Sequence, residues 1–434
     1  MRSKSIRWWG VLTLFAVVAI SYIDRINIAV LITDSSFLQH FGMEAQDRSA
    51  QGALATAFML GYGVSSFLLT PFCTAFLGVR RSLVCGLLVW GAISFLSPWL
   101  SSYGMLLTSR VLLGVAEGPL LALASAYIKA HFDTAENGKP NSLVNMGTGF
   151  GLAIGYPLVG YLVAGLDWEN SFQVVGLLNL VLGIPLVLAF VRMPANDIGS
   201  TAQASNGGAG GRVGDIVSGA LRTRYLLTIT LLTAAMLSYL WGSSNWLPAY
   251  LKEARGFSLK EMGWLASLPQ YALMLGMLLS GFLIDRIRRE KRSLIFVGAS
   301  ACVAAFVLLA ISARNPYLAT AGLIAANLCC GLLAPLIPST VQAYSRPEHI
   351  ASAFGVVNGI GSLAAGFMPA LMGAVISAVS ASGGKTAGFF AGFALLICSQ
   401  LVVLACGVRL WLGERAQGSP DVELEGSSSC NRVG

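Results

Sequence analysis

The chain has 434 residues, of which 55% are hydrophobic and only 11% are charged. Soluble domains average about 25% charged residues, so this composition excludes a protein whose whole surface faces water. The formal net charge of +8 does not indicate a nucleic-acid partner, because the basic residues are distributed as in a membrane protein.

Apolar runs long enough to cross a bilayer recur along the whole chain. A membrane-spanning helix needs about 20 mostly apolar residues. The runs predict an all-α integral membrane protein of twelve helices, in two pseudo-symmetric bundles of six. The predicted spans lie near residues 8–32, 50–72, 82–100, 105–128, 141–165, 171–192, 225–251, 262–285, 293–312, 317–344, 350–378 and 386–411.

Positive charges gather on one side of the predicted membrane. The segments on the N-terminal side contain 20 Lys and Arg residues, and the opposite loops contain 6. The positive-inside rule therefore predicts that both termini lie in the cytoplasm. Residues 252–255 fall in one of the opposite loops, where we expect them to be solvated.

A segment rich in Gly, Ser and Ala divides the spans into six and six. Residues 193–224 have the composition of a flexible linker. The fifth and eleventh spans support two related halves, because NMGTGFGLAIGYPLVG and NGIGSLAAGFMPALMG share an Asn, spaced glycines and a late proline. The predicted parts are an N-terminal six-helix bundle (1–195), a cytoplasmic linker (196–223), a C-terminal six-helix bundle (224–413) and a disordered cytoplasmic tail (414–434).

Four charged residues lie inside the predicted spans away from the span ends, and we call them the charged cluster. They are Asp24 and Arg25 in the first span, and Arg110 and Glu117 in the fourth. An ionised side chain at the centre of a span costs about 2.5–3.5 kcal/mol, so such residues are functional candidates. Neighbours on a helix point about 100° apart, so Asp24 and Arg25 need different partners. Arg110 and Glu117 are two helical turns apart and share one face.

The residue types of the charged cluster suit proton-coupled binding of an anion. Arg stays charged, and its planar fork matches a carboxylate with two hydrogen bonds. Asp and Glu can gain and lose protons inside a membrane protein. Two arginines and two carboxylates balance to zero, so protonation of one carboxylate leaves a positive cavity that attracts an anion. The alternative is a fixed ion-pair network that holds the first and fourth helices together.

Two motifs carry a more specific resemblance. The sequence Tyr22-Ile23-Asp24-Arg25 with Asn27, and the sequence SRVLLGVAEGP at 109–119, resemble the anion:cation symporter family of the major facilitator superfamily. That family includes bacterial transporters of sugar acids such as galactonate and glucarate. The resemblance implies a fold of twelve helices and a place in the cell (inner) membrane.

The resemblance also implies roles for individual residues. It assigns proton coupling to Asp24 and Glu117, and contact with the substrate carboxylate to Arg25. Softer matches add further substrate-binding candidates, which are Tyr22, Tyr62, Arg110, Thr148 and Asn358. Thr148 aligns where sugar-acid members carry glutamine, so the substrate is either a sugar acid or a less hydroxylated or aromatic carboxylate.

The superfamily also has a gating loop between the second and third spans. Here that place reads PFCTAFLGVRR, which keeps Gly78, Arg80 and Arg81 but lacks the usual aspartate-arginine pair. The equivalent segment of the second half, GFLIDRIRR, keeps Asp285 and Arg286. The resemblance implies that these charged residues gate the transporter on the cytoplasmic side.

The sequence predicts a monomeric secondary transporter that imports an organic carboxylate with protons by alternating access. Its expected partners are a small organic anion and membrane lipids, with no nucleic acid, metal or cofactor beyond the coupling proton. An exporter or antiporter of the same fold is the nearest alternative, because the fifth span is rich in glycine and proline. The sequence has no sizeable soluble domain, which argues against a sensor, and no catalytic cluster, which argues against an enzyme.

Overall fold

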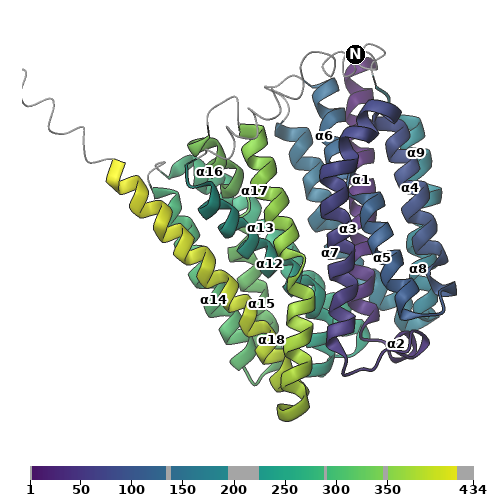
Figure 1. The fold of residues 1–434 in the computed structure, drawn as a ribbon, viewed down its shortest axis with the longest axis vertical. Coiled ribbons are helices and arrows are strands. Elements are labelled where there is room, and N and C mark those ends of the chain that lie inside the picture. The colour runs from purple at the N-terminus through teal and green to yellow at the C-terminus, as the bar shows by residue number, and fades with distance from the viewer. Residues whose placement is uncertain (1, 133–137, 194–223, 288–290, 346–349, 418–434) are drawn as a thin grey trace, which may run out of the picture.

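The computed structural model describes residues 2–132, 138–193, 224–287, 291–345 and 350–417. Within these ranges the regular structure is helical, and the long helices run roughly parallel to one another (Figure 1). The first half of the chain forms α1 (Arg2–Leu31), α2 (Ser35–His40), α3 (Arg48–Phe72), α4 (Gly78–Leu96), α5 (Tyr103–Glu117), α6 (Leu120–His131), α7 (Gly138–Leu166), α8 (Trp168–Leu177) and α9 (Ile184–Phe190).

The second half lies beside the first in Figure 1, where its colours run from teal to yellow. The predicted linker 196–223 lies outside the described residues, and so does the tail beyond Gln417. The predicted limits of the bundles therefore stay a prediction. The helices of this half are α12 (Leu226–Ala249), α13 (Leu259–Arg286), α14 (Ser293–Ser312), α15 (Pro316–Gly331), α16 (Leu336–Tyr344), α17 (Ile350–Ala365) and α18 (Met368–Gln417).

The helices are apolar outside as well as inside. Large hydrophobic side chains are exposed on many of them, such as Val181 at 68% and Trp264 at 66%. Such a surface is stable in lipid, where each helix satisfies its own backbone groups. In the described ranges, ten helical segments are long and apolar enough to cross a membrane. The chain is therefore a multi-pass membrane protein, and the count of twelve spans remains a prediction.

Three predicted spans are divided differently in the structure, and one of them, 317–344, is broken between α15 and α16. The predicted eleventh span, 350–378, is broken at Gly366 and Phe367, between α17 and α18. Helix α18 then continues beyond the predicted end of that span and bends at Gly384, whose φ of 81° is the left-handed conformation that glycine adopts readily. The fourth span is also broken, because Pro119 follows Gly118 between α5 and α6 and has no backbone N–H to donate.

One group of polar contacts between the two halves lies toward the end of the molecule opposite residues 2 and 417, which we call the far side (Figure 1). Arg48 at the start of α3 forms an ion pair with Glu253, and Lys252 donates a hydrogen bond to the backbone oxygen of Thr33. Ser377 donates to the backbone oxygen of Gln46. The expectation of a solvated loop at 252–255 was therefore wrong: Lys252 and Glu253 fasten one half to the other, and Arg255 donates to backbone oxygens of Ala310 and Ala313 in its own half.

Glycines allow helices of the two halves to approach each other closely on the far side. A Cβ atom on Gly52 would overlap the backbone oxygen of Pro369, and one on Gly373 would overlap the backbone oxygen of Arg48. Helices α3 and α18 can therefore touch backbone to backbone, as small residues permit in membrane helices. The described structure is closed on its far side.

The Arg48–Glu253 ion pair should contribute to this closure. Neutralising it with Glu253→Gln should cost about 1 kcal/mol, or about fivefold in the ratio of closed to open far side. Spin labels at Ser36 and Ser382, which are exposed on the far side of the two halves, would report longer distances by electron paramagnetic resonance in a cysteine-free background. Glu44→Gln, at an exposed residue, is the control that removes the same charge. An equal change of the spin-label distance in both variants would contradict the role of the pair.

Candidate functional site

Helices α3 and α5 meet through two glycines of the motif at 109–119. Cβ atoms on Gly114 and Gly118 would overlap the backbone of α3 at Phe58 and Tyr62. The two glycines are four residues apart and therefore share a helix face, which lets the helices approach closely. This packing brings Glu117, the last residue of α5, beside the aromatic side chains of α3.

Helix α1 is held in the same way against α7. Cβ atoms on Gly147 and Gly151 would overlap the backbone of α1 at Phe15 and Ala19. The spaced glycines of the predicted fifth span thus form a smooth strip along α7, on which α1 lies. One turn beyond the strip, α1 presents the motif Tyr22-Ile23-Asp24-Arg25.

Arg25 and Glu117 form a buried ion pair. Nε of Arg25 donates to Oε2 of Glu117 at 3.1 Å, and the two side chains are 5% and 0% exposed. Oε1 of Glu117 and Nη1 of Arg25 are buried without a hydrogen-bond partner. A buried pair of this kind is costly to break on one side only, because the remaining charge loses its partner. The pair therefore couples α1 to α5, since a change in the charge of either residue affects the other helix.

Four aromatic rings surround the guanidinium of Arg25. The carbon Cζ lies 4.2 Å from the ring centre of Tyr22, 4.4 Å from that of Tyr62 and 4.9 Å from that of Phe58. The fourth ring belongs to Trp241 of α12, at 5.9 Å. Cation–π contacts stabilise a charge by about 0.5–2 kcal/mol each. Since Trp241 comes from the second half, the arginine lies where the two halves meet.

Asp24 points to different partners, as the helical geometry requires. Oγ of Ser94 on α4 donates to Oδ2 of Asp24 at 2.5 Å, and both residues are fully buried. Oδ1 of Asp24 has no hydrogen-bond partner. Arg110 interacts electrostatically with Asp24 and with Glu117, so all four members of the charged cluster influence one another.

Arg110 is buried and incompletely paired. It is 1% exposed, and its Nε and Nη2 atoms have no hydrogen-bond partner. Its guanidinium carbon lies 5.8 Å from the ring centre of Phe172 on α8. Such a side chain keeps hydrogen-bond donors available for another group.

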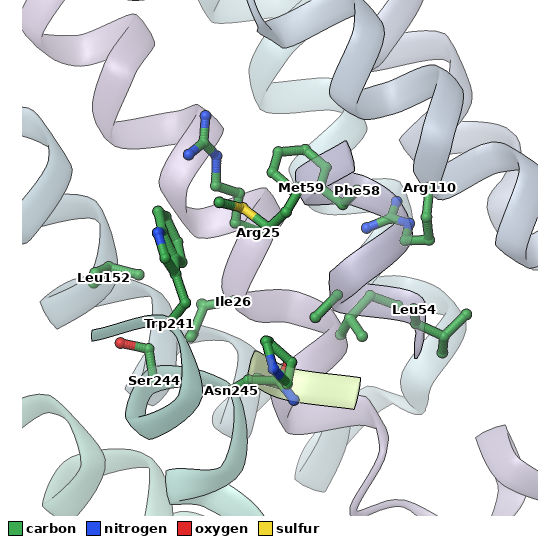
Figure 2. Close-up of a pocket in the computed structure, with 14 residues that line it drawn as sticks. Arg25, Ile26, Leu54, Phe58, Met59, Arg110, Leu152, Trp241, Ser244 and Asn245 are labelled. Atoms are coloured by element: carbon green, nitrogen blue, oxygen red, sulfur yellow. The ribbon is translucent and has the colours of Figure 1, made fainter. Parts of the chain in front are cut away.

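A narrow pocket that is partly open to its surroundings adjoins the cluster; its space not occupied by atoms, open solvent included, is about 520 Å³. Figure 2 shows Arg25 and Arg110 at separate places on its wall, with Asn245 and Ser244 of α12 on another side. The rest of the lining is apolar apart from the indole of Trp241. The complete lining is Arg25, Ile26, Ile28, Ala29, Leu54, Ala55, Phe58, Met59, Arg110, Leu152, Trp241, Ser244, Asn245 and Pro369.

The other predicted substrate residues lie apart from the ion pair. Thr148 on α7 is half-buried and donates its hydroxyl to the backbone oxygen of Asn145 at 2.7 Å. Asn358 on α17 is exposed. Tyr22 and Tyr62, by contrast, both contact Arg25, as described above.

The predicted gating residues are described only in part. The segment 71–81 comprises the end of α3, a π-helical turn, Cys73–Leu77, and the start of α4 at Gly78, whose left-handed φ of 72° interrupts the helix. Arg80 donates to the backbone oxygen of Leu188 in the same half, and Arg81 is exposed. The side chains of Asp285 and Arg286, at the end of α13, lie outside the described part of the structure.

Sequence reasoning missed two residues that touch the charged cluster. Phe58 is an apolar residue in an apolar span, and Ser94 is one of many serines, so neither gave a signal. Trp241 of α12 contacts both Arg25 and Tyr22. In the described ranges, no group of three His, Cys, Asp or Glu residues is placed to hold a metal ion.

Comparison with known proteins agrees with this architecture. A family model described as Major Facilitator Superfamily matches residues 14–369 and 229–420. The chain is 23% identical to the "Probable L-galactonate transporter" of Escherichia coli (strain K12) over 86% of its own length and 84% of the relative. It is 31% identical to the "Probable sulfoacetate transporter SauU" of Cupriavidus necator over 64% of its length and 66% of the relative.

The fold has a close counterpart among solved structures. A bacterial homologue of the human lysosomal transporter Spinster, solved in an inward-facing and unoccupied conformation, superposes with a TM-score of 0.73 at 16% identity. The match covers 94% of this chain and 97% of that one. At this identity the likeness is one of fold.

The hydrogen bond from Ser94 should stabilise the fold through Asp24. Ser94→Ala leaves a buried carboxylate oxygen without its donor, so we expect a loss of about 1–3 kcal/mol in the free energy of unfolding. Adding Ser94→Ala to Asp24→Asn should cost much less than it does in the wild type, because the two groups are coupled. Ser97→Ala, which removes a hydroxyl bonded to its own helix, is the control in denaturant melts; additive losses would show that the bond is not important.

Proposed function

The chain belongs to the Major Facilitator Superfamily of membrane transporters, and on that premise we propose that it imports an organic carboxylate together with protons. The superfamily moves solutes and is not a class of enzymes. The observation that carries the proposal is the buried Arg25–Glu117 ion pair at the meeting point of the two halves. Substrate and coupling ions bind at such a central place in transporters built from repeats.

Arg25 can hold either Glu117 or a carboxylate of the substrate. In the described structure one carboxylate oxygen of Glu117 accepts the hydrogen bond from Nε. A proton on Glu117 would remove its charge and weaken this bond, and the guanidinium would then be left in an apolar surrounding without a counter-ion. Since an unpaired buried charge is costly, an incoming carboxylate would replace the glutamate. Proton binding and anion binding are coupled in this way.

Asp24 is the second proton-coupling residue in this proposal. It interacts electrostatically with Arg110, as Glu117 does with Arg25. With all four groups charged the cluster is neutral, and each proton that it takes up adds one positive charge for an anion to balance. The electrical balance of the site thus favours an anion and protons travelling together.

The remaining substrate contacts would come from residues around the guanidinium. We assign Tyr22 and Tyr62 to the flanks of the bound carboxylate and Arg110 to a second polar contact. Thr148 and Asn358 would join the site only after the halves move. The names of the relatives specify galactonate and sulfoacetate, which share a carboxylate and differ in their hydroxyl groups.

In alternating access, the far side would open while the opposite side, where residues 2 and 417 lie, closes. We propose that the far side faces the periplasm and that both termini lie in the cytoplasm, at the inner membrane, in agreement with the charge distribution. Arg80, Arg81, Asp285 and Arg286 would then gate the cytoplasmic side. The working unit would be a monomer in contact with lipid.

The direction of coupling can be measured in proteoliposomes. Adding a transported carboxylate outside should make the external solution more alkaline, because protons enter with the anion. An exporter or antiporter would instead move the substrate outward under an inward proton gradient. That result would exclude import with protons and favour the alternative.

Replacing Glu117 separates binding from coupling. Glu117→Gln removes the titrating group but leaves an amide oxygen that can still accept from Arg25. We expect the variant to bind substrate and exchange it across the membrane, yet to lose accumulation driven by a proton gradient. Uptake and counterflow of labelled substrate would be compared with Glu169→Gln, a change on α8 outside the cluster. Accumulation at the wild-type level in Glu117→Gln would contradict the role.

A further inference from the structure

The polar atoms on the pocket wall that lack partners are all of one kind. The buried atoms without a hydrogen bond are Nη1 of Arg25, Nε and Nη2 of Arg110, and Nδ2 of Asn245, among the described residues that line the pocket. Each of them is a nitrogen that donates. A buried donor without a partner costs about 1–3 kcal/mol, so this wall favours a ligand that brings acceptors.

These donors lie at three places on the wall: Arg25 of α1, Arg110 of α5 and Asn245 of α12 (Figure 2). Asn245 is 7% exposed and belongs to the second half, so the donors come from both halves. Donors that lie apart on one wall can hold the two ends of one molecule.

The wall offers little to a molecule with many hydroxyl groups. Beyond the donors, its side chains are apolar except for Trp241 and Ser244. The hydroxyl of Thr148, on the neighbouring α7, already donates within its own helix. Each hydroxyl of a sugar acid needs an acceptor as well as a donor, and a hydroxyl buried against apolar side chains loses its bonds to water.

The charges of the cluster agree with two anionic ends. Arg25 is neutralised by Glu117, and Arg110 interacts electrostatically with Asp24. Two protons, one on each carboxylate, would leave two positive charges, and a dianion would balance both. A monoanion would leave one guanidinium buried without a counter-charge, which is unfavourable.

We propose, resting on the proposed function, that the substrate is a compact dianion with few hydroxyl groups. Its carboxylate binds Arg25, its second anionic group, a carboxylate or a sulfonate, binds Arg110, and Asn245 donates a hydrogen bond to the bound dianion from the second half. Asn245 is then a specificity-determining residue of the second half.

Binding to the purified full-length protein tests this assignment. The probes are succinate and sulfoacetate as compact dianions, butyrate as a monoanion of similar length, and galactarate and galactonate as hydroxylated acids. We expect succinate or sulfoacetate to bind at least about tenfold more tightly than butyrate, galactonate and galactarate. Asn245→Asp, which replaces a donor by a negative charge at nearly constant size, should abolish the preference over butyrate. Arg110→Lys should reduce it, and Met146→Leu, at an exposed residue of α7 outside the pocket lining, should leave it unchanged.

The outcomes distinguish the inference from the proposed function. Arg25-dependent binding in which galactonate, galactarate or butyrate equals succinate and sulfoacetate would overturn the inference and leave carboxylate transport intact. The inference would also fall if Asn245→Asp weakened monoanions and dianions equally. If none of the acids bound, or if Arg25→Gln bound them as well as the wild type, the proposed function would fail as well.

Discussion

The structure depends on one guanidinium that is buried where two halves of a membrane protein meet. Arg25 has a single described carboxylate partner, Glu117, and four aromatic rings that hold its charge in an apolar surrounding. Burial makes the loss of this ion pair costly, because a charge without a counter-ion is unfavourable inside protein or lipid. Whatever replaces Glu117 must therefore be an anion.

The rest of the architecture places and protects this group. Glycines on α5 let it pack closely against α3, and glycines on α7 let it pack closely against α1. The aromatic rings and Glu117 therefore come together around Arg25. Trp241 completes the ring set from the other half, so a movement between the halves would change the surroundings of Arg25 directly. The far-side contacts of Arg48 and Lys252 hold the halves together at one end. A local proton exchange can thus be linked to a movement of whole bundles.

The sequence predicted the components of the site better than their connections. Asp24, Arg25, Arg110 and Glu117 could be identified because charged residues inside membrane spans are costly and therefore rare. The pairing of Arg25 with Glu117 depends on packing between helices that are far apart in sequence. Phe58 and Ser94 resemble ordinary span residues, and only their contacts reveal their position.

The same limit applies to the fold. Hydropathy found the helical spans, since lipid exposure requires long apolar runs. It did not find the break between α17 and α18 or the fastening of Lys252 and Glu253 to the first half. The second of these depends on tertiary contacts: Lys252 and Glu253 look like loop residues until Thr33 and Arg48 are placed opposite them.

The central claim is that an anion and Glu117 compete for Arg25, and proton uptake on binding tests it most directly. Calorimetric titration of the purified protein with succinate, in buffers of different ionisation enthalpy, counts the protons taken up for each anion bound. The account predicts net proton uptake near neutral pH that falls by one proton in Glu117→Gln. Binding without proton uptake, or uptake unchanged in that variant, would contradict it.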